Sequence, residues 1–169
     1  MKHTVFFLIV FKIITFSVFA NDLSLFNTIK QAGKLDEYLF VSFSMSDQDL
    51  IELSAQAQIV KMTLVISGFD EHSTDGLEHT KLRISQINHS CCENKGPVWM
   101  IYPQLFERFN IKTVPSFVIS KNSNDNIPEF TKISGEMSVQ NALKYIYAGT
   151  NYSLIKKQAK ISYLMFKED

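Results

Sequence analysis

The stretch FNIKTVPSFVI, residues 109–119, places a proline directly before an apolar, β-branched run. Proline has no amide hydrogen to give a central strand, so it stands at the first position of a strand or on a sheet edge. Pro115 therefore either begins an ordinary strand, or the Val114–Pro115 bond is cis and holds a turn beside a groove. X-Pro is almost the only kind of bond that is cis at modest cost. The rest of the chain has to decide between these two interpretations.

The chain begins with a positive and then apolar segment, MKHTVFFLIVFKIITFSVFA. Val18 and Ala20 match the small-residue pattern of a cleavage site, so the segment is typical of a secretory signal peptide. Lys12 interrupts the apolar run, and the remaining pieces are short for a membrane span of about 20 residues. We expect a cleaved signal peptide at 1–20, with an uncleaved anchor as the alternative.

The 17 basic and 17 acidic residues balance, and the mature chain becomes mildly acidic because Lys2 and Lys12 leave with the signal peptide. The one lysine-rich stretch is IKKQAK, residues 155–160. A nucleic-acid binder would carry a broader basic footprint. We therefore expect a protein or peptide partner and no nucleic acid.

Hydrophobic periodicity predicts an alternating order of helices and strands. Ser46, with Asp49 three residues later, reads as an N-cap with an acidic first turn. The polar segment 120–128 reads as a hairpin loop, so the strands on either side are antiparallel and the sheet is mixed. The expected elements are a helix at 23–32, a strand at 38–44, a helix at 46–60, a strand at 62–67, a helix at 74–89, a strand at 98–102, a short helix opened by Pro103, two strands at 116–120 and 129–134, and a helix capped by Ser138.

This order resembles the thioredoxin-like fold, in which the proline after a run such as FNIKTVP is cis; the resemblance implies a cis bond before Pro115. Three motifs, YLFVSFSMSDQDLIEL, YPQLFERFNIKTVPSFVI and GEMSVQNALKYI, are similar to those of the TrbC family, the pilin assembly proteins of F-type conjugative transfer systems. The resemblance covers roughly residues 38–148. It predicts an α/β, thioredoxin-like fold with a mixed central sheet flanked by helices and an inserted helix before the cis-proline half.

The resemblance also implies a function. We expect a periplasmic, non-enzymatic protein required for assembly of the conjugative pilus and its type IV secretion system during plasmid DNA transfer, with a TraW-type periplasmic protein as partner. We expect no cofactor, no small-molecule substrate and no stable membrane anchoring after signal cleavage. The expected domains are a signal peptide at 1–20, a leading helical segment at 21–37, a thioredoxin-like domain at 38–149 and an amphipathic tail at 150–169.

The position where a redox thioredoxin carries C-x-x-C has no sulfur nucleophile and reads Ser44-Met45-Ser46-Asp47. Thiol exchange needs a thiolate, and a serine hydroxyl cannot form a disulfide. A serine nucleophile would need a base such as histidine within reach, and no histidine here stands in a motif that promises one. We therefore expect a binding groove, where a strand end leaves backbone groups free to pair with an extended peptide. The groove residues are Ser44, Met45, Ser46, Val114 and Pro115.

The two cysteines are adjacent, Cys91 and Cys92 in HSCCENKGP, and cannot supply a C-x-x-C. Adjacent residues close a strained ring, so the first interpretation is a pair of thiols in a loop. A disulfide to a partner chain and a vicinal disulfide are the alternatives. The competing function that these residues allow is a periplasmic thiol-disulfide oxidoreductase or isomerase working through Cys91 and Cys92.

Two groups of metal-ligating residue types also stand close in sequence. Neither has a recognised zinc-finger spacing, so we interpret them as surface side chains and expect no metal site. The groups are His72, Asp75 and His79, and His89, Cys91, Cys92 and Glu93.

The tail after Gly149 has apolar residues near one helical face, Ile155, Ala159, Tyr163 and Phe166. This pattern predicts a helix that packs on the domain or on a partner. A helix lying on a membrane surface is the alternative, against which the acidic end of the chain counts.

Overall fold

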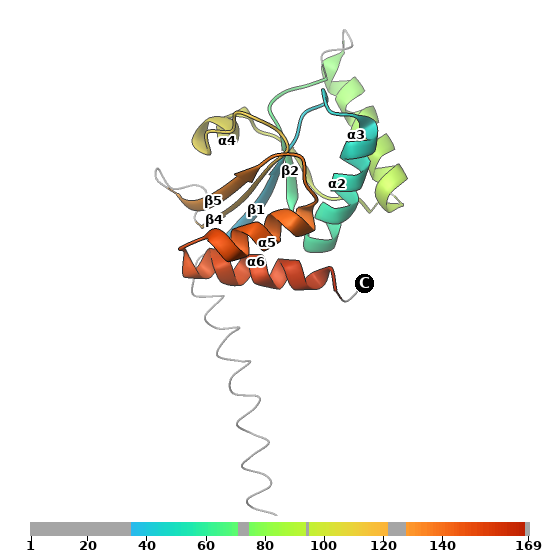
Figure 1. Ribbon diagram of the computed structural model, residues 1–169. Helices are drawn as coiled ribbons and strands as arrows, with labels where there is room; N and C mark the ends of the chain where they lie inside the picture. The colour runs from blue at the N-terminus through green and yellow to red at the C-terminus, as the bar shows by residue number, and fades with distance from the viewer. Residues whose placement is uncertain (1–34, 71–74, 94, 122–127, 168–169) are drawn as a thin grey trace, which may run out of the picture. The chain divides into compact units, whose positions relative to one another are not determined.

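The computed structural model describes residues 35–70, 75–93, 95–121 and 128–167 (Figure 1). The expected signal peptide at 1–20, the expected helix at 23–32, His72 and most of the loop at 120–128 lie outside these residues.

Five strands form one mixed sheet in the order β3-β2-β1-β4-β5. β1, β2 and β3 run parallel to one another, whereas β4 is antiparallel to both β1 and β5. The predicted α/β architecture, a mixed sheet flanked by helices, is confirmed, and it is compatible with a thioredoxin-like fold. The strands are β1 (Leu35–Phe40), β2 (Thr63–Ile66), β3 (Trp99–Ile101), β4 (Ser116–Lys121) and β5 (Glu129–Ser134).

The helices follow in the predicted order: α2 (Asp47–Val60), α3 (Gly76–Cys92), α4 (Pro103–Arg108), α5 (Val139–Gly149) and α6 (Ser153–Met165). The Val114–Pro115 bond is cis, as predicted. The inserted helix is α3, and the strand that follows it, β3, adds to the sheet edge beside β2.

The first strand begins and ends earlier than the sequence pattern indicates. Residues 35–37, which we assigned to a leading helical segment, belong to β1, and residues 41–44 do not continue it. The pairing with β4 explains both ends. Leu35 pairs with Lys121 at the last residue of β4, and Phe40 pairs with Ser116 at its first. The residue before Ser116 is a proline, which has no amide hydrogen to extend the ladder.

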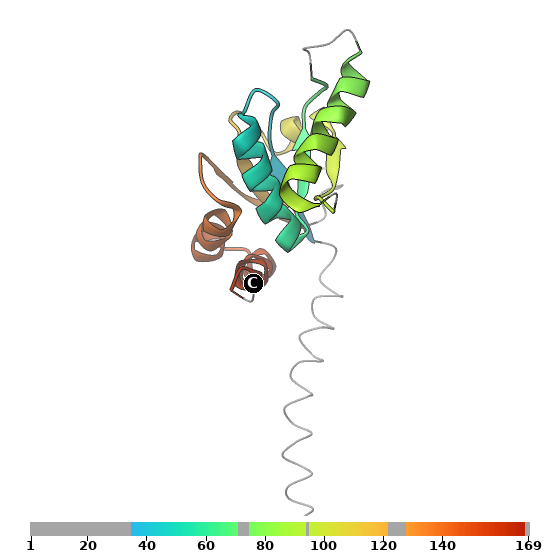
Figure 2. The same cartoon turned by 90° about the vertical axis from the view of Figure 1, so that its right-hand side faces the viewer.

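Each face of the sheet buries its own core. Leu39 of β1 pairs with Leu64 of β2 and Phe117 of β4, and all three are buried against α2, α3, α5 and α6. On the opposite face, Phe40 and Val118 are buried with Leu105 of α4. Figures 1 and 2 show α4 on the side of the sheet away from α2 and α3. Alternate residues of the central strands thus serve two separate cores.

The C-terminal tail is part of the folded unit. Ile155 and Ala159 of α6 are buried in the same core as Leu39. Fully burying an aliphatic side chain the size of Ile155 contributes about 1.5–3 kcal/mol, so α6 packs on the domain as an integral element. None of the helices in the described ranges combines the length and hydropathy that a bilayer-spanning helix needs.

Candidate functional site

The five groove residues expected from the sequence line one open pocket of about 580 Å³. Two distant parts of the chain meet there: the loop and first turns of α2, and the segment that enters β4. A third wall comes from the turn between β5 and α5. The other lining residues are Asp49, Glu52, Leu53, Gln56, Glu136, Met137 and Ser138.

Caps and a glycine hold the walls of this groove. The hydroxyl of Ser46 accepts a hydrogen bond from the amide of Asp49 at 3.1 Å, so the predicted N-cap of α2 is confirmed. The hydroxyl of Ser138 caps α5 in the same way, through the amide of Asn141 at 3.1 Å. Gly135 precedes this cap with φ of 132°, a region that glycine enters without a Cβ clash. The Ser138 cap and the conformation of Gly135 therefore fix the turn between β5 and α5.

Two hydrogen bonds tie the walls together. The amide of Gly135 donates to the carbonyl oxygen of Pro115 at 3.0 Å. The amide of Val139 donates to Oε1 of Gln56 at 2.9 Å, which joins the start of α5 to α2. The groove is consequently a preformed feature of the fold, with its three segments fixed relative to one another.

Val114, in the groove lining, has backbone polar groups that bond to no described residue. Its neighbours are engaged, because the carbonyl of Thr113 accepts from the hydroxyl of Ser116 at 2.6 Å and that of Pro115 accepts from Gly135. Among the described residues, none forms a hydrogen bond with the amide or the carbonyl of Val114. This backbone unit can therefore pair with another chain.

The groove lining carries three carboxylates, Asp49, Glu52 and Glu136, and no lysine or arginine. Asp49 accepts a hydrogen bond from the hydroxyl of Ser46 at 2.6 Å, and Glu52 accepts one from the side-chain amide of Gln48 at 2.6 Å. These bonds orient Asp49 and Glu52, and no ion pair with a described residue compensates the charge of the three carboxylates. The groove is electronegative and disfavours an anionic ligand.

The serine hydroxyls of the groove form hydrogen bonds within the loop and the N-cap of α2. Ser44 Oγ lies 2.9 Å from the hydroxyl of Ser42, and Ser46 Oγ contacts Asp49 in the cap. Within the described ranges, no hydrogen bond joins either serine to a histidine. A serine nucleophile needs a base within about 2.6–3.2 Å, so this geometry does not assemble one.

A cluster around Arg83 of α3, which the sequence did not reveal, borders the same loop. Nη2 of Arg83 lies 2.7 Å from Oδ1 of Asp47, and Nη1 lies 3.0 Å from Oδ2 of Asp70, whose side chain is only 2% exposed. The guanidinium also lies 4.9 Å from the ring centre of Phe43, which stacks on Trp99. These contacts attach the inserted helix to the loop that leads into the groove.

The electrostatics of the Arg83 cluster favour the charged guanidinium. Burial by itself would lower the pKa of Arg83, but its hydrogen bonds and charge interactions with Asp47 and Asp70 raise it overall. Because these partners stand 36 and 13 residues away in sequence, no local pattern could have indicated the cluster.

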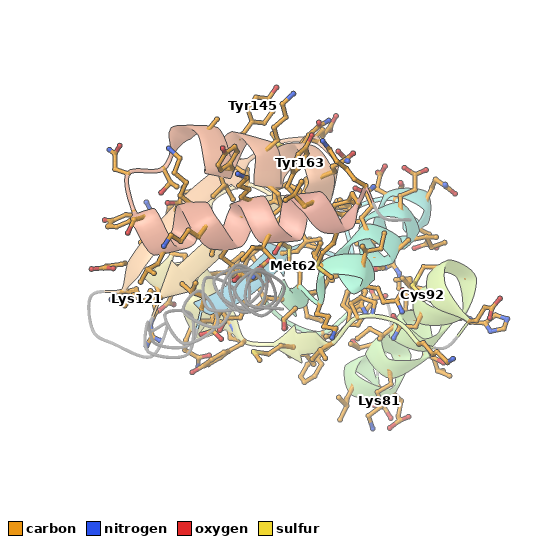
Figure 3. The ribbon with its side chains drawn as sticks, turned by 90° about the horizontal axis from the view of Figure 1, so that it is seen from below. Met62, Lys81, Cys92, Lys121, Tyr145 and Tyr163 are labelled. Atoms are coloured by element: carbon orange, nitrogen blue, oxygen red, sulfur yellow. A yellow bond between two sulfur atoms is a disulfide. The ribbon has the colours of Figure 1, made fainter. Side chains whose placement is uncertain are left out.

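Cys91 and Cys92 lie in the last turn of α3, as Figure 3 shows for Cys92, so the expected loop placement was wrong. The structure joins the two sulfurs in a vicinal disulfide, which is one of the alternatives left open above. α3 ends after Cys92, where Glu93 adopts the left-handed conformation and its amide donates a hydrogen bond to the carbonyl of Asn88. Neither cysteine lines the groove.

Two of the residues grouped as metal-ligand candidates, Asp75 and His79, make other contacts, and His72 lies outside the described residues. Asp75 caps α3 through the amide of Glu78 at 3.3 Å, and Nδ1 of His79 lies 3.1 Å from Oδ2 of Asp70. In the part of the chain that the structure describes, no three His, Cys, Asp or Glu side chains are placed to hold a metal ion together.

One comparison with known proteins gives a match. The model of the type-F conjugative transfer system pilin assembly protein family, TrbC_Ftype, matches residues 39–146, a range that contains every groove residue. No curated protein and no solved structure matches the chain.

Proposed function

This chain belongs to the TrbC family of type-F conjugative transfer pilin assembly proteins, and we propose that it acts there as a periplasmic, non-enzymatic module whose groove binds an extended peptide. Membership indicates a role in pilin assembly together with other components of the conjugative transfer system. The proposal adds the compartment, the absence of catalysis and the binding site. A TraW-type periplasmic protein is the partner that we propose.

The observation that carries the proposal is the groove around Val114. Its backbone amide and carbonyl are free of bonds to any described residue, and a strand begins two residues later at Ser116. An extended peptide can pair with such a backbone unit, which supplies affinity, while the pocket beside it accepts side chains and supplies specificity. The volume of about 580 Å³ falls within the range of about 300–1,000 Å³ that ligand sites usually occupy.

The negative charge of the groove restricts which peptides can bind there. With Asp49, Glu52 and Glu136 in the lining, a basic or neutral segment is favoured and an acidic one is repelled. We therefore propose that the bound segment carries lysine or arginine close to the residue that pairs with Val114.

The serine geometry supports binding rather than catalysis. The hydroxyl of Ser44 lies beside the hydroxyl of Ser42, and the hydroxyl of Ser46 accepts the amide hydrogen of Asp49 as the N-cap of α2. The disulfide of Cys91 and Cys92 lies at the end of α3, outside the groove lining. A binding module uses the groove without any thiol.

Photo-crosslinking in cells that carry the complete transfer system tests this proposal. A crosslinking amino acid is placed at Ser44 or Met137 in the groove, and at the exposed Ser85 on α3 as the matched control. We expect one transfer protein to be captured from both groove positions and not from Ser85. Equal capture from all three positions, or none from the groove, contradicts the proposal.

A blocking variant connects binding to function. Ser44→Trp should fill the groove and weaken binding of the peptide about tenfold or more, which corresponds to about 1.4 kcal/mol of binding free energy, and mating frequency should fall with it. Ser85→Trp adds the same ring elsewhere and should transfer normally. Protein abundance is measured beside mating frequency, so that loss of the protein is not mistaken for loss of binding.

Fractionation of the same cells tests the compartment. We expect the protein in the periplasmic fraction, with a mass that corresponds to a chain beginning at Asn21 after removal of the signal peptide. A full-length chain recovered with membranes would show the uncleaved anchor instead.

A further inference from the structure

The outer surface of α5 and α6 is basic. Between Val139 and Lys167 the sequence contains five lysines and no aspartate or glutamate. All five lysine side chains are exposed. The groove is lined by carboxylates, so the two surfaces suit ligands of opposite charge. The lysines are Lys144, Lys156, Lys157, Lys160 and Lys167.

Aromatic rings lie between these lysines and join the two helices. The ammonium groups of Lys156 and Lys160, on α6, lie 5.9 and 5.8 Å from the ring centre of Tyr147 on α5. The ammonium of Lys167 lies 5.4 Å from the ring of Tyr163. Figure 3 shows Tyr145 and Tyr163 on this α5–α6 layer, and Tyr145 is 58% exposed. Cation–π contacts thus make the surface continuous across both helices.

Apolar side chains complete the surface. Ile161 and Leu164 are 40% and 41% exposed, and each follows a lysine of α6 by four residues. Residues four apart share one side of a helix. The opposite side of α6 is buried in the domain core through Ile155 and Ala159. The outer side therefore presents lysines and large apolar groups together.

We propose that this α5–α6 face binds reversibly to a membrane surface that displays anionic lipid headgroups. The basic side chains of the face are all lysines, which are flexible point charges, whereas arginine would be favoured for bidentate contacts to one defined carboxylate or phosphate. Lysines spread over two helices suit a diffuse layer of charge. Tyrosine, isoleucine and leucine between them suit the interface, where an apolar body enters and a polar end stays in water.

The packing of α5 against α6 makes a membrane-binding surface more favourable than the sequence of the tail alone indicated. In sequence, the acidic residues Glu168 and Asp169 counted against a lipid surface for the tail. The structure packs α5 against α6, and Lys144 and Tyr145 of α5 are exposed, so the helix pair carries five lysines against those two acids. A polybasic patch with exposed apolar groups provides the two signals that peripheral binding needs.

Vesicle sedimentation tests the inference on protein purified from the soluble fraction of cells that produce the full chain. We expect binding to vesicles of phosphatidylglycerol with phosphatidylethanolamine, weakening as salt is added, and none to vesicles of phosphatidylcholine. Lys156→Glu, Lys157→Glu and Lys160→Glu combined should weaken binding roughly a hundredfold or more, since each lysine near an anionic surface accounts for roughly fivefold.

A second triple variant provides the matched control. Lys61→Glu, Lys95→Glu and Lys112→Glu change the net charge by the same amount at exposed positions outside α5 and α6, and should retain binding. Both variants have the same N-terminal sequence, so any contribution of that segment to vesicle binding is the same in both. Circular dichroism melts establish that both are folded. Leu164→Ser should weaken binding at constant charge.

Several results would overturn the inference. These are absence of wild-type binding to anionic vesicles, equal binding to neutral and anionic vesicles, and equal losses in the two triple variants. Binding of an acidic polypeptide such as polyglutamate to this face, without binding of vesicles, would assign the face to an acidic protein partner instead.

Discussion

Ser162 of α6 donates a hydrogen bond of 2.7 Å from its hydroxyl to the carboxylate of Glu37 on β1, across 125 residues of sequence. Gln158 donates to the same oxygen, Oε1, at 2.5 Å. The other oxygen, Oε2, is buried without a hydrogen-bond partner among the described residues. Burial raises the pKa of Glu37, and the bonds from Ser162 and Gln158 oppose this effect only in part.

The buried carboxylate predicts a pH-dependent stability. Because its pKa is higher in the folded state than the ordinary value of 4.5, the folded state binds the proton more tightly. The free energy of unfolding then decreases as the pH rises from that value through the folded pKa. Glu37→Gln removes the charge and should be more stable than the wild type at neutral pH, with the difference shrinking as the pH falls toward 4.5.

Urea unfolding at a series of pH values measures this difference. Glu107→Gln, at an exposed position on α4, is the control and should show a much smaller change. A constant difference between Glu37→Gln and the wild type at all pH values would rule out titration of Glu37 as the cause.

Ser162→Ala removes a hydrogen bond to a buried carboxylate and should destabilise the protein by about 2 kcal/mol at neutral pH. The loss should be smaller in the Glu37→Gln background, where the charge is absent. A double-mutant cycle on Glu37 and Ser162 gives the coupling free energy. Ser153→Ala, on the exposed side of α6, should cost less than about 0.5 kcal/mol. Equal losses in both backgrounds would mean that the hydroxyl does not act through Glu37.

Arg83→Ala should destabilise the protein by about 2 kcal/mol or more, because it leaves the buried Asp70 without its guanidinium partner. Lys81→Ala on the same helix is the control. It removes an ion pair to Glu78 in which both side chains are 59% exposed, and such pairs contribute about 0–1 kcal/mol. Thermal melts of the two variants compare the contributions. Similar melting temperatures would show that the Arg83 cluster does not hold the inserted helix in place.

Cys91→Ser combined with Cys92→Ser should leave DNA transfer near the wild-type frequency, since neither cysteine lines the groove. A bond between adjacent residues closes almost no loop of the unfolded chain, so its removal should change stability little. Mating frequency at equal protein abundance is the measurement, and insulin reduction by the purified protein is the companion assay. Loss of transfer together with insulin reduction would favour the thiol-disulfide function.

The order of the elements was predictable because it rests on local patterns. The N-caps Ser46 and Ser138 are readable from residue type and spacing, and Pro103 at a helix start follows from its missing amide hydrogen. The five groove residues came together because the strand–helix junction and the start of β4 meet at the pairing of Phe40 with Ser116.

What the sequence did not reveal depends on contacts between distant residues. The polar start of β1 was assigned to the leading helical segment, because no local pattern indicates that Leu35 pairs with Lys121. Glu37, a charged residue in a strand, gives no sign that Ser162 will cover it. The link between Arg83 and Asp47 joins an inserted helix to a loop that precedes it by 36 residues. Periodicity reports which residues are apolar, not which partners a polar residue will find.

The burial of α6 also sets when the protein can fold. Leu39 of β1 shares its core with Ile155 and Ala159 of α6, more than 110 residues later in the sequence. A growing polypeptide therefore lacks one wall of this core until α6 has been synthesised, because a domain folds as a unit. If the chain is exported as proposed above, this core stays open on one side until α6 emerges, which leaves a period before folding in which export can begin.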